Sequence, residues 1–190
     1  FYFFVFWAVM LCWFVFASAF LLRTRPPKNV QMKRSNGSLA GILIVAIGYA
    51  VVWSFRRPTM SAILPMVPYA QAVVDVLTVA IAVGSVWIAL SAVRALGKQW
   101  SPSARLVEGH KLIVDGPFRF VRHPIYLGML GLMVATGLAV SYFYLVILAI
   151  LIAVAGTMIR VHFEEKLLRE AFGFEFDAYR RKVPAFIPWL

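Results

Sequence analysis

The sequence reads Gly116-Pro117-Phe118-Arg119-Phe120-Val121-Arg122-His123-Pro124-Ile125-Tyr126 between two long apolar segments. The Gly-Pro dipeptide that opens this stretch is a turn signal. Proline suits the first position of a helix, because its missing N–H is not needed there. We therefore expect residues 116–123 to form a polar surface loop and Pro124 to begin a membrane helix.

The composition around this stretch is that of an integral membrane protein. Of the 190 residues, 62% are hydrophobic and only 14% are charged, whereas soluble domains average about 45–50% apolar and about 25% charged residues. The net charge of +11 comes from basic residues that alternate with apolar segments. It therefore indicates membrane topology rather than nucleic-acid binding. We expect the lipid bilayer as a partner and no nucleic acid.

The apolar segments predict about five membrane helices. Phe1–Leu22 carries no charge and no proline, and as a helix it would reach about 33 Å. Its uninterrupted apolar length favours a membrane span over a cleaved signal peptide. Further spans are expected at Leu39–Phe55 and Val73–Val93. Ile125–Ile159 has 35 apolar residues, too many for one crossing, and predicts a tight hairpin of two helices that turns at Gly137–Tyr142.

The basic residues predict the orientation of these spans. Seventeen of the 19 Lys and Arg residues fall in the first connection, the third connection and the C-terminal tail, and two fall in the second connection. By the positive-inside rule, the side with seventeen is the cytoplasm. The predicted fold is an all-α integral membrane protein with its N-terminus outside. Its third connection and its C-terminal amphipathic helices would be cytoplasmic.

A second polar cluster, with Arg160, His162, Glu164 and Glu165, follows the last apolar segment. Arg160 and Glu164 are four residues apart and could simply pair on one face of a helix that continues from the apolar segment and ends at Gly173. The arginines of the first stretch could likewise serve only as membrane anchors, and composition alone favours that interpretation. In contrast, the helix start at Pro124 would offer free N–H groups to an anion. Together the two clusters suggest a binding site at the membrane face.

Several other kinds of site are absent from the sequence. His110, His123 and His162 lack the spacing of metal ligands, and the lone Cys12 cannot complete a thiolate site. No metal is therefore expected. Asp75 is the only acid predicted within a span and lies near its end, which counts against a channel or transporter. The sequence also contains no P-loop and no nucleophile elbow.

The segment Arg94–Leu190 resembles the isoprenylcysteine carboxyl methyltransferase family of integral membrane enzymes and its bacterial relatives. The matching pieces occur in a specific order and spacing: His110-Lys111-Leu112-Ile113, Gly116-Pro117-Phe118, Arg122-His123-Pro124-Ile125-Tyr126, Arg160, Glu164-Glu165, Phe172-Gly173, Tyr179, Val183-Pro184 and Pro188. The resemblance implies S-adenosylmethionine as the methyl donor and S-adenosylhomocysteine as its product. Residues 94–190 would form the methyltransferase core with a cytoplasmic cofactor-binding loop, and residues 1–93 would add three transmembrane helices.

The resemblance also implies roles for individual residues. Arg160 would engage the carboxylate of the acceptor, Glu164 would bind the cofactor, and Arg122 and Glu165 would support the site. Phe118 stands where the family usually has tyrosine, so a hydroxyl contact is lost and a stacking surface is kept. The other expected cofactor contacts are Arg105, His110, Lys111, Leu112, Ile113, His123, Pro124, Ile125 and Tyr126.

The implied reaction is O-methylation of the carboxylate of an isoprenylcysteine-like or other lipophilic acceptor. A sulfonium methyl is already activated, so the site must mainly position the reactants, which can supply roughly 7–11 kcal/mol of the barrier. Three alternatives stay open. One is a phospholipid N-methyltransferase, in which His123 or Glu165 would deprotonate an amine. The others are a non-catalytic membrane scaffold that keeps the fold and a membrane reductase with a similar His-Pro-x-Tyr pattern.

Overall fold

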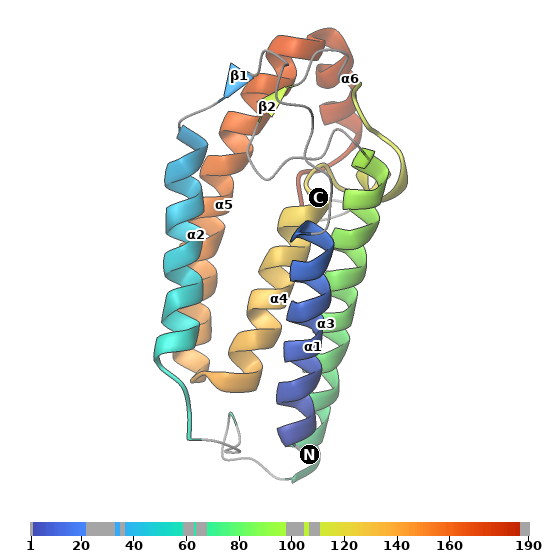
Figure 1. The fold of residues 1–190 in the computed structure, drawn as a ribbon. Coiled ribbons are helices and arrows are strands. Elements are labelled where there is room, and N and C mark those ends of the chain that lie inside the picture. The colour runs from blue at the N-terminus through green and yellow to red at the C-terminus, as the bar shows by residue number, and fades with distance from the viewer. Residues whose placement is uncertain are drawn as a thin grey trace.

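The structure, a computed structural model, describes residues 2–21, 33–34, 37–58, 63, 68–97, 105–106 and 111–186. Nearly all the regular structure in these residues is helical (Figure 1), so the predicted fold class is confirmed. The elements in chain order are α1 (Tyr2–Leu21), β1 (Lys33–Arg34), α2 (Gly37–Ser54), α3 (Pro68–Leu96), β2 (Arg105–Leu106), the 3-10 helix η2 (Gly116–Arg119), α4 (Pro124–Val140), α5 (Phe143–Phe172) and α6 (Phe174–Lys182). The two short strands pair antiparallel.

Four helices, α1, α2, α3 and α5, are long and apolar enough to cross a membrane, and the apolar helix α4 is shorter. The protein is therefore an integral membrane protein. Helices α4 and α5 run antiparallel and are separated by two residues, so the predicted hairpin is confirmed (Figure 1). Its turn is shorter than predicted, because α4 continues through Gly137 to Val140. The N–H of Ser141 still donates to the carbonyl oxygen of Gly137, at 2.8 Å.

The predicted bounds of the third span are wrong. Helix α3 begins at Pro68 rather than Val73 and extends beyond Val93 to Leu96. Helix α5 runs for 30 residues in all, past the apolar segment to Phe172, and Gly173 ends it as predicted. Such a helix reaches about 45 Å, well beyond the roughly 30 Å hydrocarbon core of a bilayer. The second polar cluster therefore lies on a rigid extension of the last membrane helix.

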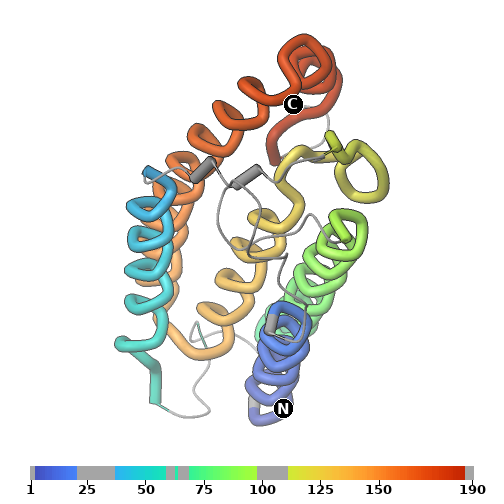
Figure 2. Tube along the Cα trace, turned by 45° about the horizontal axis from the view of Figure 1, so that its top comes forward, coloured from blue at the N-terminus to red at the C-terminus, as the bar shows by residue number. Residues whose placement is uncertain are grey.

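The transmembrane part is built from two closely packed helix pairs. Helix α2 packs along α5 and α3 packs along α4, while α1 lies against α3 and α4 (Figures 1 and 2). Glycines allow the closest approaches. A Cβ atom on Gly41 would lie 2.6 Å from the carbonyl oxygen of Gly156, and one on Gly128 would lie 2.6 Å from that of Ser85. Gly128 therefore allows α4 to pack closely against α3.

At the hairpin end of the molecule, Arg57 joins the end of α2 to the turn between α4 and α5. Its Nε donates to the carbonyl oxygen of Ser141 at 2.6 Å, and its Nη2 donates to that of Leu138 at 2.8 Å. The hydroxyl of Ser141 donates in turn to the carbonyl oxygen of Phe55 at 3.0 Å. These contacts satisfy carbonyl groups that the end of α4 leaves without helical partners. They hold α2 beside the hairpin.

At the opposite end, residues 116–123 are only partly the polar surface loop that was expected. Phe118, Val121 and His123 are buried. The reason is that the C-terminal segment returns to the start of α4 and covers them (Figure 2). The N–H of Arg122 donates to the carbonyl oxygen of Pro184 at 2.8 Å, and that of His123 to Ala185 at 3.1 Å.

Candidate active site

The two polar clusters meet where α4 begins and the charged end of α5 passes beside it. Pro124 occupies the first turn of α4, as predicted, and His123 is the residue that precedes the helix. Tyr126 lies on the first turn and reaches α5. Its hydroxyl donates to Glu164 Oε2 at 2.6 Å and accepts from Arg160 Nε at 3.2 Å. We call Tyr126, Arg160 and Glu164 the Glu164 cluster.

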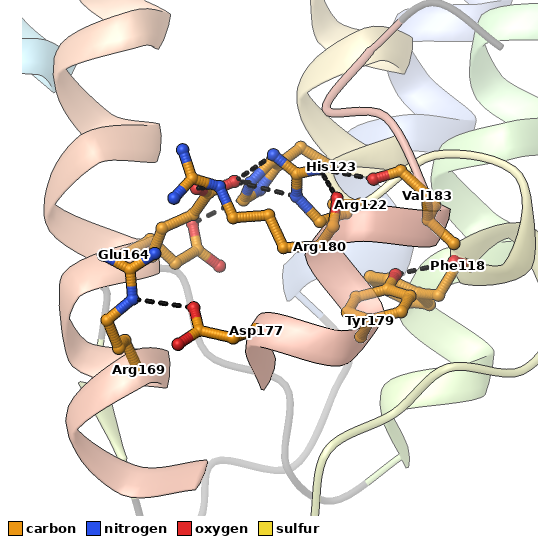
Figure 3. A network of polar contacts seen from close by, with 10 residues as sticks. Phe118, Arg122, His123, Glu164, Arg169, Asp177, Tyr179, Arg180 and Val183 are labelled. Atoms are coloured by element: carbon orange, nitrogen blue, oxygen red, sulfur yellow. Dashed lines mark hydrogen bonds and ion pairs between the residues drawn. The ribbon is translucent and has the colours of Figure 1, made fainter. Parts of the chain in front are cut away.

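The neighbouring acid, Glu165, binds three side chains from other parts of the fold. Its Oε1 accepts from Arg122 Nε at 2.9 Å and lies 3.2 Å from His123 Nε2. Its Oε2 lies 3.3 Å from Nε of Arg180 on α6. The Glu165 side chain is only 12% exposed, and a buried carboxylate needs such partners to offset lost hydration. We call these four residues the Glu165 cluster (Figure 3).

His123 stands between the two clusters. Its ring stacks on Tyr126, with centroids 5.7 Å apart and an angle of 15° between the planes. On another side it meets Phe186 of the C-terminal segment, at 5.8 Å. Its Nδ1 is 4.0 Å from Glu164 Oε2, while its Nε2 faces Glu165. The buried imidazole therefore links the acids of both clusters to the aromatic side chains around them.

Helix α6 and the segment after it hold the start of α4 in place. The Tyr179 hydroxyl donates to the carbonyl oxygen of Phe118 at 2.6 Å (Figure 3). Burial raises the pKa of the Tyr179 phenol, so it remains a donor at neutral pH. Arg122 Nη1 donates to the carbonyl oxygens of Arg180 and Val183. The C-terminal segment is thus bonded to the loop before α4 through both side chains and backbone.

An apolar cavity of about 180 Å³ runs from the Glu164 cluster into the membrane part. Its walls come from one face of α2, one face of α4 and two residues of α5. The lining residues are Ile42, Val45, Ala46, Tyr49, Tyr126, Met129, Leu130, Met133, Thr157 and Arg160. Arg160 and Tyr126 are the polar end of this cavity. The arrangement suits a molecule with an apolar chain and a negatively charged or polar head.

The close contact of α2 with α5 also shapes the position of Arg160. A Cβ atom on Gly41 would lie only 2.6 Å from Cγ of Arg160. The aliphatic stem of the arginine therefore lies directly against the backbone of α2. The guanidinium carbon lies 5.0 Å from the centre of the Tyr126 ring, within the range of a cation–π contact. Helix packing on one side and a phenol on the other fix this cation at the cavity.

A family profile described as "Phospholipid methyltransferase" matches residues 73–175, more than half of the chain. The chain belongs to the phospholipid methyltransferase family. The match includes all of α4 and α5, and therefore both polar clusters except Arg180. The resemblance inferred from the sequence is confirmed at the level of the family.

Relatives in this family carry more specific names. The chain is 34% identical over 79 residues to "Protein-S-isoprenylcysteine O-methyltransferase" of Schizosaccharomyces pombe, which covers 42% of this chain and 34% of that protein. It is 33% identical over 81 residues to "Probable protein-S-isoprenylcysteine O-methyltransferase" of Oryza sativa subsp. japonica, covering 43% and 42%. It is 29% identical over 86 residues to "Protein-S-isoprenylcysteine O-methyltransferase B" of Arabidopsis thaliana, covering 45% and 44%. The matched part spans less than half the length of these relatives.

The structure divides the predicted site residues into three groups. The two clusters bring together Arg122, His123, Tyr126, Arg160, Glu164 and Glu165. Other predicted residues lie close by in sequence without belonging to either cluster: Lys111 is exposed, Leu112, Ile113 and Ile125 are half-buried, and Phe118 and Pro124 are buried. His110 and the side chain of Arg105 lie outside the described residues.

Sequence reasoning missed two parts of the site. The first is α6, whose Arg180 and Tyr179 bind the Glu165 cluster and the loop before α4. The second is α2, which supplies one wall of the cavity. The spacing of Gly37, Gly41 and Gly48 was the available signal, because small residues along one helix face indicate close packing against another helix.

The described residues contain no group of three His, Cys, Asp or Glu side chains placed to hold a metal ion. The donors that gather at the Glu164 cluster are a carboxylate, a phenol and a guanidinium. A carboxylate accepts hydrogen bonds from hydroxyl and amino groups, and a guanidinium binds carboxylates with two parallel hydrogen bonds. The cluster is therefore suited to a ligand that carries hydroxyl, amino or carboxylate groups.

Proposed function

We propose that the protein is a membrane-embedded, S-adenosylmethionine-dependent methyltransferase that O-methylates the carboxylate of a lipophilic acceptor. Isoprenylcysteine-like compounds are the first acceptors to test. One observation carries the proposal: the Tyr126 hydroxyl bonds to Glu164 on one side and to Arg160 on the other, at the polar end of an apolar cavity. Membership of the family and the names of the relatives support methyl transfer.

The residues around Glu164 fit the proposed cofactor by their chemistry. The Glu164 side chain is 33% exposed, so its carboxylate can accept hydrogen bonds from amino or hydroxyl groups of a ligand. The half-buried Leu112 and Ile113 precede η2 and would offer apolar surface to an adenine ring. When bound, S-adenosylmethionine supplies a methyl group on a positively charged sulfur. The distribution of basic residues supports a cytoplasmic position for this site.

Arg160 would hold the acceptor. A guanidinium binds a carboxylate in a fixed, two-point geometry, and Arg160 lies where the apolar walls of the cavity end. The acceptor chain would lie between α2 and α4, with its carboxylate at Arg160. The apolar walls would exclude water. Tyr126, bonded to both side chains, would hold Arg160 and Glu164 in a fixed position relative to each other. No general base is needed, because the acceptor is already an anion.

Phospholipid N-methylation is the second candidate, because the matching profile carries that description. Two features of the site favour the carboxylate instead. The cation of Arg160 would repel a protonated amine at the polar end of the cavity. His123 and Glu165, the candidate bases for such an amine, lie against each other at 3.2 Å and are not among the cavity-lining residues.

The first test is calorimetric binding of S-adenosylhomocysteine to the detergent-purified protein. We expect micromolar binding that Glu164→Gln weakens and that Glu175→Gln, at an exposed residue of α6, leaves unchanged. Absence of binding to folded wild-type protein would refute the methyltransferase proposal in favour of a scaffold. Methyl transfer to farnesylcysteine analogues would then support the carboxylate acceptor. Transfer to phosphatidylethanolamine vesicles alone would support the amine.

A further inference from the structure

Tyr49 closes the end of the cavity that lies away from the Glu164 cluster. Helices α2 and α4 both run from the charged end of the molecule toward the hairpin turn (Figure 1). Along α2, Tyr49 comes seven residues after the lining residue Ile42, which is about 10 Å of helix. Its hydroxyl donates to the carbonyl oxygen of Met129 on α4, at 2.7 Å. The phenol therefore crosses the cavity from one wall to the other.

The Tyr49 ring also packs against Trp13 of α1. The rings of Trp13 and Tyr49 meet edge to face, with centroids 5.3 Å apart and an angle of 73°. The indole N–H of Trp13 donates to Thr136 Oγ1 on α4, at 2.9 Å. Beside Tyr49, the fully buried Met133 completes this end of the cavity. Three helices therefore hold the ring in place, and Trp13 occupies the space immediately beyond it.

The volume of the cavity limits what it can hold. An apolar cavity of about 150 Å³ accommodates a benzene molecule, and this cavity of about 180 Å³ is only slightly larger. By that comparison it takes a chain of about six to eight carbon atoms. A whole farnesyl group exceeds this volume, so part of it would lie outside the space between Arg160 and Tyr49.

We propose that Tyr49 determines the length of the apolar chain that the acceptor places between α2 and α4, and that the preferred acceptor is an anion with a short chain. This inference rests on the proposed function, which puts the acceptor carboxylate at Arg160. A chain that extends from Arg160 toward the hairpin meets the Tyr49 ring. Removing the ring would join the cavity to the space in front of Trp13 and admit a longer chain.

One test locates the apolar chain of a bound ligand by fluorescence and does not require methyl transfer. Bromine quenches tryptophan fluorescence on contact, so a long alkyl carboxylate with bromine at its end should quench Trp13 in Tyr49→Ala and not in the wild type. Replacing Trp13 with Phe in the Tyr49→Ala protein should remove the added quenching. Leu43→Ala, on the exposed face of α2, should quench like the wild type. Equal quenching in Tyr49→Ala and wild type would overturn the proposal.

A second test reads chain-length selectivity. The wild type should prefer S-dimethylallylcysteine, with its short chain, to S-farnesylcysteine derivatives, and Tyr49→Ala should shift the ratio of their kcat/KM values toward farnesyl on the order of tenfold. Tyr49→Phe keeps the ring and should keep the wild-type ratio. Tyr49→Leu serves if the alanine variant does not fold. An unchanged ratio would mean that the chain leaves sideways past the exposed Ala46, and would overturn the proposal.

The two tests separate this inference from the proposed function. Added Trp13 quenching in Tyr49→Ala without any methyl transfer would support the chain site and refute the enzymatic proposal. Methyl transfer whose chain-length ratio is the same in wild type and Tyr49→Ala would support the enzyme and refute the role of Tyr49.

Discussion

Two neighbouring acids on α5 belong to regions with different chemistry. On one side, the Glu165 cluster joins α5 to the loop before α4 and to α6 through Arg122, His123 and Arg180. On the other, Glu164 is about one-third exposed and meets the phenol of Tyr126 at the polar end of a cavity. The difference shows how two adjacent positions on one helix can face different surroundings, one that stabilises the fold and one that would bind ligands.

The largest expected effect comes from Glu165→Gln, which leaves the nearly buried Arg122 and the half-exposed Arg180 without a full negative charge beside them. Removing one partner of a buried ion pair costs roughly 3–5 kcal/mol, and we expect the lower end because Arg180 is half exposed. Thermal unfolding in detergent should show a lower Tm and weaker S-adenosylhomocysteine binding together. Weaker S-adenosylhomocysteine binding at an unchanged Tm would place Glu165 in the ligand site and contradict the distinction between Glu164 and Glu165.

Arg160→Lys should affect turnover without affecting the fold. Lysine keeps the charge but cannot reproduce the two-point geometry of a guanidinium. A small misplacement of a reacting group can cost on the order of 100-fold in rate. We expect such a loss in kcat, with S-adenosylhomocysteine affinity close to that of the wild type. An equal loss of turnover and cofactor affinity would contradict the assigned role of Arg160.

Tyr126→Phe should have a smaller effect on activity, because it removes the hydroxyl that bonds to both Glu164 and Arg160. A hydrogen bond to a charged group contributes about 1.5–3 kcal/mol, and the lower figure corresponds to roughly a tenfold fall in kcat/KM. The matched control is Tyr179→Phe, which removes the bond to Phe118 and leaves the Glu164 cluster intact. That control should lower Tm and keep kcat/KM. The comparison fails if the two variants lose the same activity.

Asp177→Asn should have the smallest effect. Asp177 pairs with Arg169 at 2.9 Å, but both side chains are well exposed, at 39% and 51%. Exposed pairs contribute about 0–1 kcal/mol. We therefore expect nearly unchanged Tm and activity, measured beside Glu165→Gln. A Tm loss as large as that of Glu165→Gln would show that burial is not what distinguishes the two pairs.

Local sequence signals predicted much of the fold. Proline at position 124 and glycine at position 173 correctly marked a helix start and a helix end, and Gly173 has a positive φ of 49° that favours glycine. Apolar length predicted the hairpin. The bounds of the third span at Val73 and Val93 were missed because α3 extends beyond them at both ends, and hydropathy does not mark where a helix begins or ends.

The candidate site was predictable only where its residues lie in the two polar stretches that flank apolar segments. Arg160, Glu164 and His123 stood out because polar residues are unusual beside a membrane helix. The role of Arg180 and the wall formed by Tyr49 depend on contacts between residues far apart in the chain. Sequence periodicity gives the face of a helix but not the helix that it meets.

The unbroken length of α5 has a consequence for the membrane in which the protein works. About 25 Å of continuous helix separates Phe143 at the hairpin from Arg160, close to the thickness of a bilayer's hydrocarbon core. In a thicker bilayer, Arg160 would be drawn below the headgroups, and tilting would be needed to restore its height. The rigid helix thus fixes the distance between the hairpin turn and Arg160. We expect lipids of different acyl length to change the depth of Arg160 in the membrane, and with it the rate of the proposed reaction, without contacting the site.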